Sequence, residues 1–146
     1  MNTKILVCDL EYAKKIKELG VMQGSCFYWR KQHHVPFKDQ DFKLFSDKGC
    51  DFPATYSAWT TTELGIMLPD KYINEEDNTF YSYKYAKTEH DFVGLYINFF
   101  TKDSWKVIAS TRDKKEANAR SKMLIHLIEN KHIKVEEINE RLKGAN

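Results

Sequence analysis

A short stretch near the middle of the chain carries both a start signal and a stop signal for a helix. Thr60 precedes Glu63 by three residues, which is the spacing of a capping box, in which each side chain accepts a hydrogen bond from the other residue's backbone N–H. Pro69 follows soon after, and proline does not continue a helix because it has no backbone N–H. The spacing therefore predicts a short helix over residues 61–68.

The chain has the length and composition of one folded domain. Its 146 residues are enough to bury a sizeable core, and we expect a single globular domain over residues 1–146. Hydrophobic residues make up 42% of the sequence, which excludes general disorder. Aromatic residues make up 14%, which favours strands because rings pack well on a pleated surface.

The charges are nearly balanced and the cysteines are few. Lysine and arginine number 23 against 21 aspartate and glutamate, which argues against a dedicated DNA-binding domain, since such a domain needs a strongly basic surface. Cys8, Cys26 and Cys50 form no C-x-x-C pair, so neither a zinc knuckle nor a secreted disulfide framework is indicated. No apolar run is long enough for a signal peptide or a membrane span. We therefore expect a cytoplasmic protein with reduced thiols and no membrane contact.

Helical periodicity is present near both ends of the chain. Apolar residues recur at helical spacing over residues 10–19, with Asp9 placed as the N-cap and Gly20 as the stop. Residues 135–142 show the same period and end near Gly144. We expect a helix at each place.

A longer helix is predicted before the last one. It begins at Asp113, and Glu116 follows three residues later, again the spacing of a capping box. An apolar stripe should place this helix on the sheet, and it contains Ala117, Ser121, Met123, Leu124, Leu127 and Ile128.

Five segments have the alternation or the aromatic content of strands. They are residues 25–31, 42–45, 79–86, 92–100 and 105–109. The fourth segment is apolar almost throughout, which is typical of a central strand, and the short connection 101–104 predicts an antiparallel hairpin with the fifth. We expect a loop over residues 33–41 and a surface connection over residues 69–78.

The elements together predict an α+β fold. Their order along the chain is α-β-β-α-β-β-β-α-α. We expect an antiparallel sheet of about five strands with the helices packed on it.

The sequence contains no motif that names a reaction. Cys26 with His33 or His34 is the best candidate for a nucleophile and its base. A free cysteine on a strand is more often a small buried hydrophobe, and no G-x-S-x-G motif surrounds any serine. We therefore assign no catalytic residue, and a small hydrolase is a distant alternative.

Motifs for metal ions and phosphate are also lacking. His33 and His34 are adjacent, so on a strand they point to opposite faces. His126 and His132 are six residues apart, which differs from the i, i+4 spacing of two ligands on one helix face. Residues 88–91, which include one further histidine, have the features of a polar hairpin turn. The scattered glycines form no G-x-G-x-x-G or P-loop pattern, so we expect no metal and no cofactor.

Two strands interleave aromatic rings with cations, which suits single-stranded nucleic acid because bases stack on rings and phosphates contact cations. The first strand contributes Tyr28, Trp29, Arg30 and Lys31. The second strand contributes Tyr81, Tyr83, Lys84 and Tyr85. The alternative is that one face of each strand belongs to the core and that the tyrosines are edge residues with their hydroxyls in water.

Exposed aromatic side chains also fit a second role, in which they anchor a protein partner. Trp59 and Trp105 lie in strongly patterned elements, which favours the core for both, whereas Trp29 is open to either position. A net charge of +2 offers nucleic acid little electrostatic attraction. We therefore expect a non-enzymatic module that binds a protein partner, with single-stranded nucleic acid as the alternative ligand.

Four segments carry most of the caps, turns and apolar stripes. They are residues 17–21, 25–29, 57–69 and 117–130. Together they resemble a small family of bacteriophage and prophage proteins whose members mostly lack an assigned function, and the likeness covers most of the chain. The resemblance implies an accessory protein in a bacterial cytoplasm, and it implies no active site that can be carried over.

Overall fold

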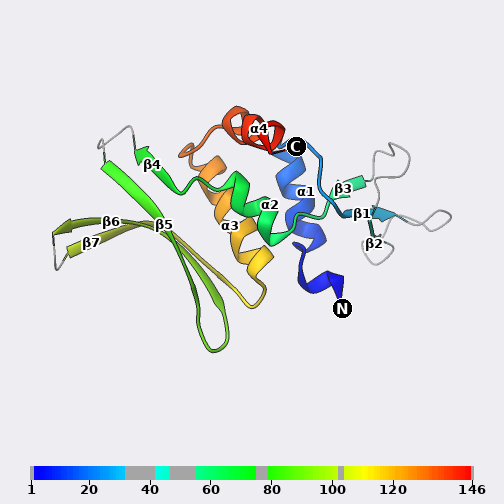
Figure 1. Ribbon diagram of the computed structural model, residues 1–146, viewed down its shortest axis with the longest axis horizontal. Coiled ribbons are helices and arrows are strands. Elements are labelled where there is room, and N and C mark those ends of the chain that lie inside the picture. Colours follow the sequence, from blue (N-terminus) through cyan, green and yellow to red (C-terminus); the bar gives the residue numbers. More distant parts are fainter. Residues whose placement is uncertain (1, 32–41, 47–54, 75–78, 102–103, 146) are drawn as a thin grey trace.

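Two antiparallel sheets lie on opposite sides of a layer of helices (Figure 1). The computed structural model describes residues 2–31, 42–46, 55–74, 79–101 and 104–145. One sheet has three strands in the order β2-β1-β3, and the other has four strands in the order β4-β5-β6-β7. The fold is therefore α+β, as predicted, but the strands form two sheets rather than one.

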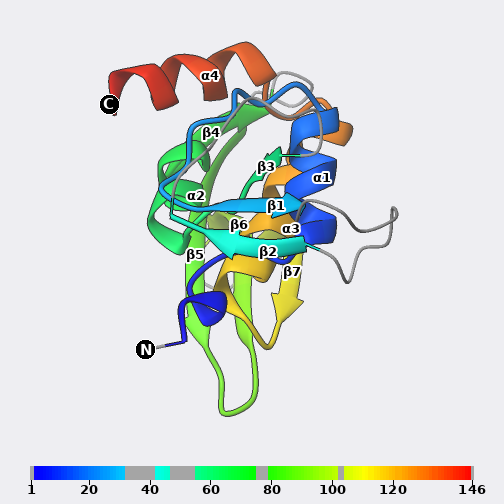
Figure 2. The ribbon, with the colours of Figure 1, turned by 90° about the vertical axis from the view of Figure 1, so that its right-hand side faces the viewer.

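The three-stranded sheet is made from the first half of the chain. Its central strand β1 (Tyr28–Lys31) pairs with β2 (Phe42–Phe45) on one side and with β3 (Thr55–Ser57) on the other. Figure 2 shows this sheet in front of α3. The antiparallel pairing of β1 with β2 confirms the prediction for these two segments.

The first strand is shorter than predicted because the residues before it have other partners. The Ser25 hydroxyl donates a hydrogen bond to the Glu63 carboxylate over 2.8 Å, and the Cys26 N–H donates to the same carboxylate over 2.9 Å. These bonds connect residues 25 and 26 to the second helix, and the strand pairing of β1 begins only at Tyr28.

The four-stranded sheet is made from one continuous part of the chain. Its strands are β4 (Lys71–Asn74), β5 (Thr79–Lys87), β6 (Phe92–Thr101) and β7 (Ser104–Asp113). Each strand is antiparallel to the next, which confirms the predicted hairpin between the last two. The register between β6 and β7 shifts after Tyr96, which marks a β-bulge or similar irregularity.

The middle layer is formed by helices from both halves of the chain. They are α1 (Leu10–Glu18), α2 (Thr61–Met67), α3 (Glu116–Glu129) and α4 (Val135–Gly144), and a short 3-10 helix η1 (Thr3–Ile5) precedes them. The capping box of α2 is present, with the Thr60 N–H donating to the Glu63 carboxylate over 2.8 Å and the Glu63 N–H donating to the Thr60 hydroxyl over 3.2 Å. Gly20 follows α1 with a φ of 93°, a conformation that favours glycine, so this predicted stop is confirmed.

The core lies between α3 and the four-stranded sheet and continues to α1, α2 and α4. Helix α3 packs on β6 and β7, and its buried side chains include Leu124 and Leu127. Tyr81 and Tyr96 are fully buried on the sheet side of the same cluster. Trp59 is fully buried, as expected, whereas the side chain of Trp105 lies outside the described part of the structure.

The strands β3 and β4 were not predicted. They have three and four residues, too few for a period of two to be recognised in the sequence. Strand β4 lies within residues 69–78, where a surface connection was expected, and in it buried Tyr72 stands between exposed Lys71 and Ile73. One expected sheet becomes two because β5 pairs with β4 and β6 and not with β1, a long-range choice that local patterns do not encode.

Two aspartates that were expected to cap helices have other partners. Asp9 occupies the N-cap position of α1, but its carboxylate makes no capping hydrogen bond. Asp113 is the last residue of β7, and α3 begins at Glu116 with Lys115 as its N-cap. The capping box predicted for Asp113 and Glu116 is therefore wrong.

The remaining local predictions have mixed outcomes. Helix α4 ends at Gly144, as expected. The turn over residues 88–91 is confirmed, since the Thr88 N–H donates to the Asp91 carbonyl oxygen over 2.8 Å. The loop expected over residues 33–41 lies outside the described residues, as does Cys50.

Candidate functional site

The eight residues predicted to bind a ligand do not form one surface. Half of them are on β1 and half on β5, and these strands belong to sheets on opposite sides of the helices (Figure 1). Tyr28, Trp29 and Tyr81 are buried, with 8%, 7% and 0% of their surface exposed. A buried ring has no free face on which a base can stack, so the structure places these three residues in the core.

The other five predicted residues are more accessible. Arg30, Lys31 and Tyr83 are half-buried, and Lys84 and Tyr85 are exposed. The guanidinium of Arg120 lies 5.1 Å from the centre of the Tyr85 ring, which is a cation–π contact within the protein. A ligand-binding role for these five residues stays a prediction.

Cys26 lies beside a carboxylate rather than a base. The negative charge of Glu63, together with burial and a hydrogen bond to this carboxylate, raises the pKa of the Cys26 thiol. A raised pKa leaves less thiolate, and the thiolate is the nucleophile, so this environment disfavours catalysis by Cys26. Its proposed partners His33 and His34 lie outside the described residues.

The described residues also provide no cluster of metal ligands. No group of three His, Cys, Asp or Glu side chains within them is placed to hold a metal ion. The rings of His126 and His132 do come together, with their centres 6.2 Å apart, because the chain turns after α3. Cys8 is buried, and this burial raises its pKa to about 11.

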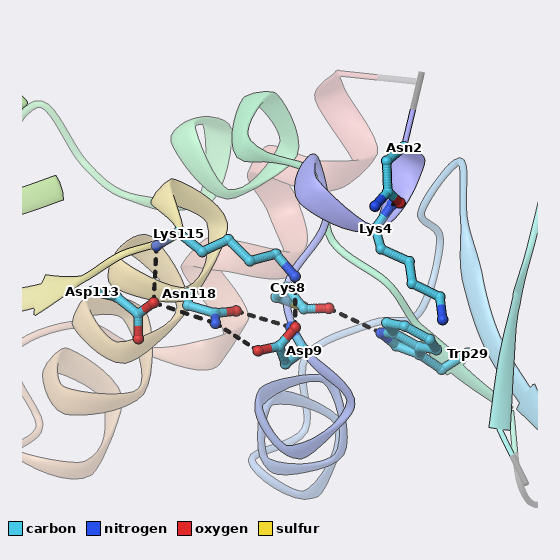
Figure 3. A network of polar contacts seen from close by, with 8 residues as sticks. All are labelled: Asn2, Lys4, Cys8, Asp9, Trp29, Asp113, Lys115 and Asn118. Atoms are coloured by element: carbon cyan, nitrogen blue, oxygen red, sulfur yellow. Dashed lines mark hydrogen bonds and ion pairs between the residues drawn. The ribbon is translucent and has the colours of Figure 1, made fainter. Parts of the chain in front are cut away.

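A polar network connects the start of α1 to the junction of β7 and α3 (Figure 3). The Asp9 carboxylate accepts hydrogen bonds from Lys115 Nζ over 2.5 Å and from Asn118 Nδ2 over 2.7 Å. The Asp113 carboxylate accepts the Lys115 N–H over 2.9 Å and lies 2.7 Å from Lys122 Nζ. The charges of this network are satisfied within the protein, so we assign it a structural role.

The electrostatics of Asp113 agree with that role. Burial alone would raise the pKa of its carboxyl group, but hydrogen bonds from Lys122, from the Lys115 N–H and from Asn118, together with the charge of Lys122, lower the pKa overall. The ionised form is therefore favoured in the folded protein.

The helices cover only one face of the four-stranded sheet (Figure 1). The covered face carries Tyr72, Tyr81 and Tyr96, which are buried. Because side chains alternate between the two faces along a strand, the strand register places another set of residues on the opposite face. We define the apolar outer face as Ile73, Phe80, Leu95, Ile97 and Val107.

Several side chains of the apolar outer face are open to solvent. Ile73 and Phe80 are direct partners across β4 and β5, with 46% and 63% of their surface exposed. Val107 on β7 is 37% exposed. The face therefore presents apolar side chains on strands at both edges of the sheet.

A second feature is a cavity of about 500 Å³ beside the edge strand β4. Its other walls are the connection between α3 and α4 and, on α4 itself, Glu137 and Arg141. We define the basic cavity by its charged and titratable lining residues, which are Lys71, Lys131, His132, Lys134, Glu137 and Arg141.

Sequence reasoning missed both of these features. The residues of the basic cavity come from segments about sixty residues apart, and no motif links them. One signal was available in the connection between the last two helices, where residues 131–134 carry two lysines and a histidine. The pair Ile73 and Phe80 had no such signal, because β4 itself was not predicted.

Comparisons with known proteins add no assignment. None of the helices in the described ranges is both long and apolar enough to cross a membrane. The chain matches no family model, no curated protein and no solved structure.

Proposed function

We propose that this protein is a non-enzymatic interaction module that binds an acidic protein partner through the apolar outer face. The observation that carries the proposal is the exposure of Ile73, Phe80 and Val107 on a sheet face that no described helix covers. Exposed apolar patches on folded domains are typical of protein interaction sites. The four-stranded sheet thus supplies a rigid platform for docking.

The chemistry of the face favours a protein over single-stranded nucleic acid. Bases need aromatic rings on which to stack. Among the side chains that the structure describes on this face, Phe80 is aromatic and the other four are aliphatic. Aliphatic side chains pack against the apolar side chains of a partner protein but provide no stacking platform.

The charges around the face indicate an acidic partner. Lys71 and Lys84 are exposed, and the register places them on the same side of the sheet as Phe80. The described strand positions on this side hold no carboxylate. In a symmetric dimer these cations would oppose like charges, whereas aspartate and glutamate on a different protein would attract them. We therefore assign the face to an acidic partner rather than to a second copy of this chain.

The proposed setting comes from the resemblance to bacteriophage and prophage proteins. An accessory protein of that kind works in the cytoplasm of a bacterial host. A bacterial lysate is therefore the source in which to look for the partner.

The test is capture of the partner from a nuclease-treated bacterial lysate by the tagged full-length protein. Phe80→Ser removes the most exposed ring of the face, and Ile5→Ser is the matched control, because Ile5 on η1 is exposed to nearly the same degree, 64% against 63%. We expect one specific protein to bind the wild type and the control, to bind Phe80→Ser at least about tenfold more weakly, and to dissociate as salt is raised.

The variants must first be shown to fold. Both substituted side chains are largely exposed, so we expect each free energy of unfolding to stay within about 0.5 kcal/mol of the wild type in urea titrations. Capture that is equally strong with Phe80→Ser would contradict the proposal. If an untreated lysate yields nucleic acid and no specific protein, the alternative ligand, single-stranded nucleic acid, is favoured. If light scattering shows a dimer that Phe80→Ser dissociates, the face belongs to the contact with a second copy of this chain.

A further inference from the structure

The described lining of the basic cavity carries more positive than negative charge. Its lining includes Lys71, Lys131, Lys134 and Arg141 against the single carboxylate of Glu137. Within the described part of the chain, the side chains of Lys71, Lys131 and Lys134 make no hydrogen bond and no ion pair. All three lysines are exposed, but they come from two separate segments and line one hollow.

Lys131 is held in this hollow at a conformational cost. It has a φ of 59°, in the left-handed region, and no other described residue except glycine has a positive φ. The Lys131 N–H donates to the Ile128 carbonyl and the His132 N–H donates to the Leu127 carbonyl, which is the Schellman motif that ends α3. Glycine is the usual residue at this position because it has no Cβ to clash. A lysine there is an outlier, and such outliers concentrate at functional sites.

Arg141 is positioned to contribute a second kind of anion donor. Its Nη1 donates to the Met67 carbonyl oxygen over 2.9 Å, which fixes the side chain on α4 against the end of α2. A guanidinium has five N–H donors, so four remain for other acceptors. Arg141 also lines a neighbouring hollow of about 530 Å³ that shares Pro69 and Lys71 with the basic cavity.

The remaining wall of the cavity is apolar. It is formed by Pro69, Tyr72, Ile73 and Ile133. A site with several cations on one side and apolar side chains on the other suits a ligand with an anionic group and an uncharged, partly apolar body. The volume of about 500 Å³ lies within the range of small-molecule sites, roughly 300–1,000 Å³.

We infer that the basic cavity binds a phosphate-bearing small molecule of about nucleotide size. The three lysines and Arg141 contact the phosphates, since lysine supplies point charges and arginine a planar fork of donors. The apolar wall contacts the body of the ligand. The basic cavity shares Lys71 and Ile73 with the surroundings of the apolar outer face. The failure of one proposal is still distinguishable from the failure of the other, because the outer face is tested through Phe80 and the cavity through Lys131.

The experiment is isothermal titration of the full-length protein with ATP, with inorganic pyrophosphate and with citrate at matched ionic strength. ATP carries phosphates and an organic body, pyrophosphate carries phosphates alone, and citrate is a polyanion without phosphate. We expect saturable one-to-one binding of ATP, weaker binding of pyrophosphate, and binding of citrate at least about tenfold weaker than that of ATP. Equal affinities for pyrophosphate and ATP would show that the organic body does not contribute to binding and would overturn that part of the inference. Equal affinities for citrate and pyrophosphate would overturn phosphate recognition.

The decisive variant is Lys131→Gly. It removes one cation and also relieves the backbone strain, so we expect the melting temperature to rise while the Kd for ATP increases at least about fivefold. Lys114→Gln, an exposed lysine outside the cavity between β7 and α3, is the charge-matched control and should bind ATP like the wild type. An unchanged Kd in Lys131→Gly, or the same loss of affinity in both variants, would overturn the inference.

Two further outcomes are informative. If folded wild-type protein gives no heat of binding with millimolar ATP or with millimolar pyrophosphate, the inference is overturned. A short single-stranded oligonucleotide is the last probe. If it binds more tightly than ATP, displaces ATP and loses affinity in Lys131→Gly, the cavity binds nucleic acid and the small-molecule inference is overturned.

Discussion

Asp9 and Asn118 are joined by two hydrogen bonds although they are 109 residues apart in the chain. The Asp9 N–H donates to Asn118 Oδ1 over 2.9 Å, and Asn118 Nδ2 donates to the Asp9 carboxylate over 2.7 Å. Asn118 is buried, and Asp9 provides a partner for both polar atoms of its side-chain amide (Figure 3). This pair fastens the start of α1 to the first turns of α3.

We expect Asn118→Ala to lower the free energy of unfolding by about 1–3 kcal/mol, because the Asp9 N–H and carboxylate each lose a partner. The measurement is a urea titration at neutral pH. Asn2→Ala is the control, since the Asn2 side chain is exposed and, within the described ranges, accepts a hydrogen bond from the Lys4 N–H alone, and it should change the stability by less than about 0.5 kcal/mol. Equal effects of the two substitutions would show that the pair with Asp9 contributes nothing of its own.

Asp113 should make the stability depend on acid. Its pKa is lower in the folded protein than in the unfolded chain, because the opposing effect of burial is exceeded by the hydrogen bonds and the charge around the carboxylate. The ionised carboxylate therefore stabilises the fold above its unfolded pKa of about 4, and this contribution is lost as the pH falls through the lower folded pKa.

Asp113→Asn tests this dependence. We expect the variant to be less stable than the wild type at neutral pH, and the difference to shrink as the pH is lowered below about 4. Urea titrations over this pH range give the difference directly. A difference that stays constant into the acid range would contradict the assignment.

The local signals in the sequence predicted helices better than sheets. The Thr60 and Glu63 capping box and the Gly20 stop depend on contacts within a few residues, and both are present in the structure. The cap expected at Asp113 was wrong because Lys115 and Lys122 compete for its carboxylate and the strand β7 extends to that residue. The spacing of residues along the sequence contains no information about a hydrogen-bond partner that comes from another element.

The candidate sites were harder to predict for the same reason. The alternation along β5 correctly separated Phe80 from Tyr81, but the sequence does not say which side of a strand the helices cover. Tyr81 is fully buried in the core and Phe80 is exposed, which reverses the role expected for Tyr81. Lys71 and Lys131 meet at one cavity only because β4 forms the edge of the sheet beside the end of α3.

The environment of Cys26 predicts a change in thiol reactivity. The charge of Glu63 is the main cause of the raised pKa of Cys26, so Glu63→Gln should lower that pKa and speed alkylation by iodoacetamide near neutral pH. The rate is measured separately for each cysteine by mass spectrometry of the peptides. Cys8 is an internal control because it is buried, with its pKa raised to about 11, and it should stay unreactive in both proteins.

The control separates a local effect from unfolding. Glu63→Gln also weakens the capping box and the bonds to Ser25 and Cys26, so some loss of stability is expected, of about 0.5–2 kcal/mol. If Cys8 reacts as fast as Cys26 in the variant, the fold has opened and the comparison must be repeated at lower temperature. A Cys26 rate at or below that of the wild type, with Cys8 protected, would contradict the role of Glu63.

Trp29 and Trp59, which are both buried, should respond differently to the same substitution. Trp29 Nε1 donates a hydrogen bond to the Cys8 carbonyl oxygen over 2.9 Å (Figure 3). Buried Trp59 Nε1, in contrast, has no hydrogen-bond partner among the described residues. Phenylalanine removes a similar volume at both positions and abolishes the indole N–H. Trp29→Phe leaves a carbonyl without its partner, and Trp59→Phe removes a donor that was already unsatisfied.

We therefore expect Trp29→Phe to lower the free energy of unfolding by about 1–2 kcal/mol more than Trp59→Phe does. Urea titrations of both variants, followed by far-UV circular dichroism so that the lost fluorophore does not matter, give this difference. Trp29→Ala should lower the stability further, by about 3–5 kcal/mol in total, because the ring belongs to the core. If the Trp29→Ala protein is instead fully folded and as stable as the wild type, the placement of Trp29 in the core is contradicted, and its predicted role as a surface anchor for a ligand is favoured.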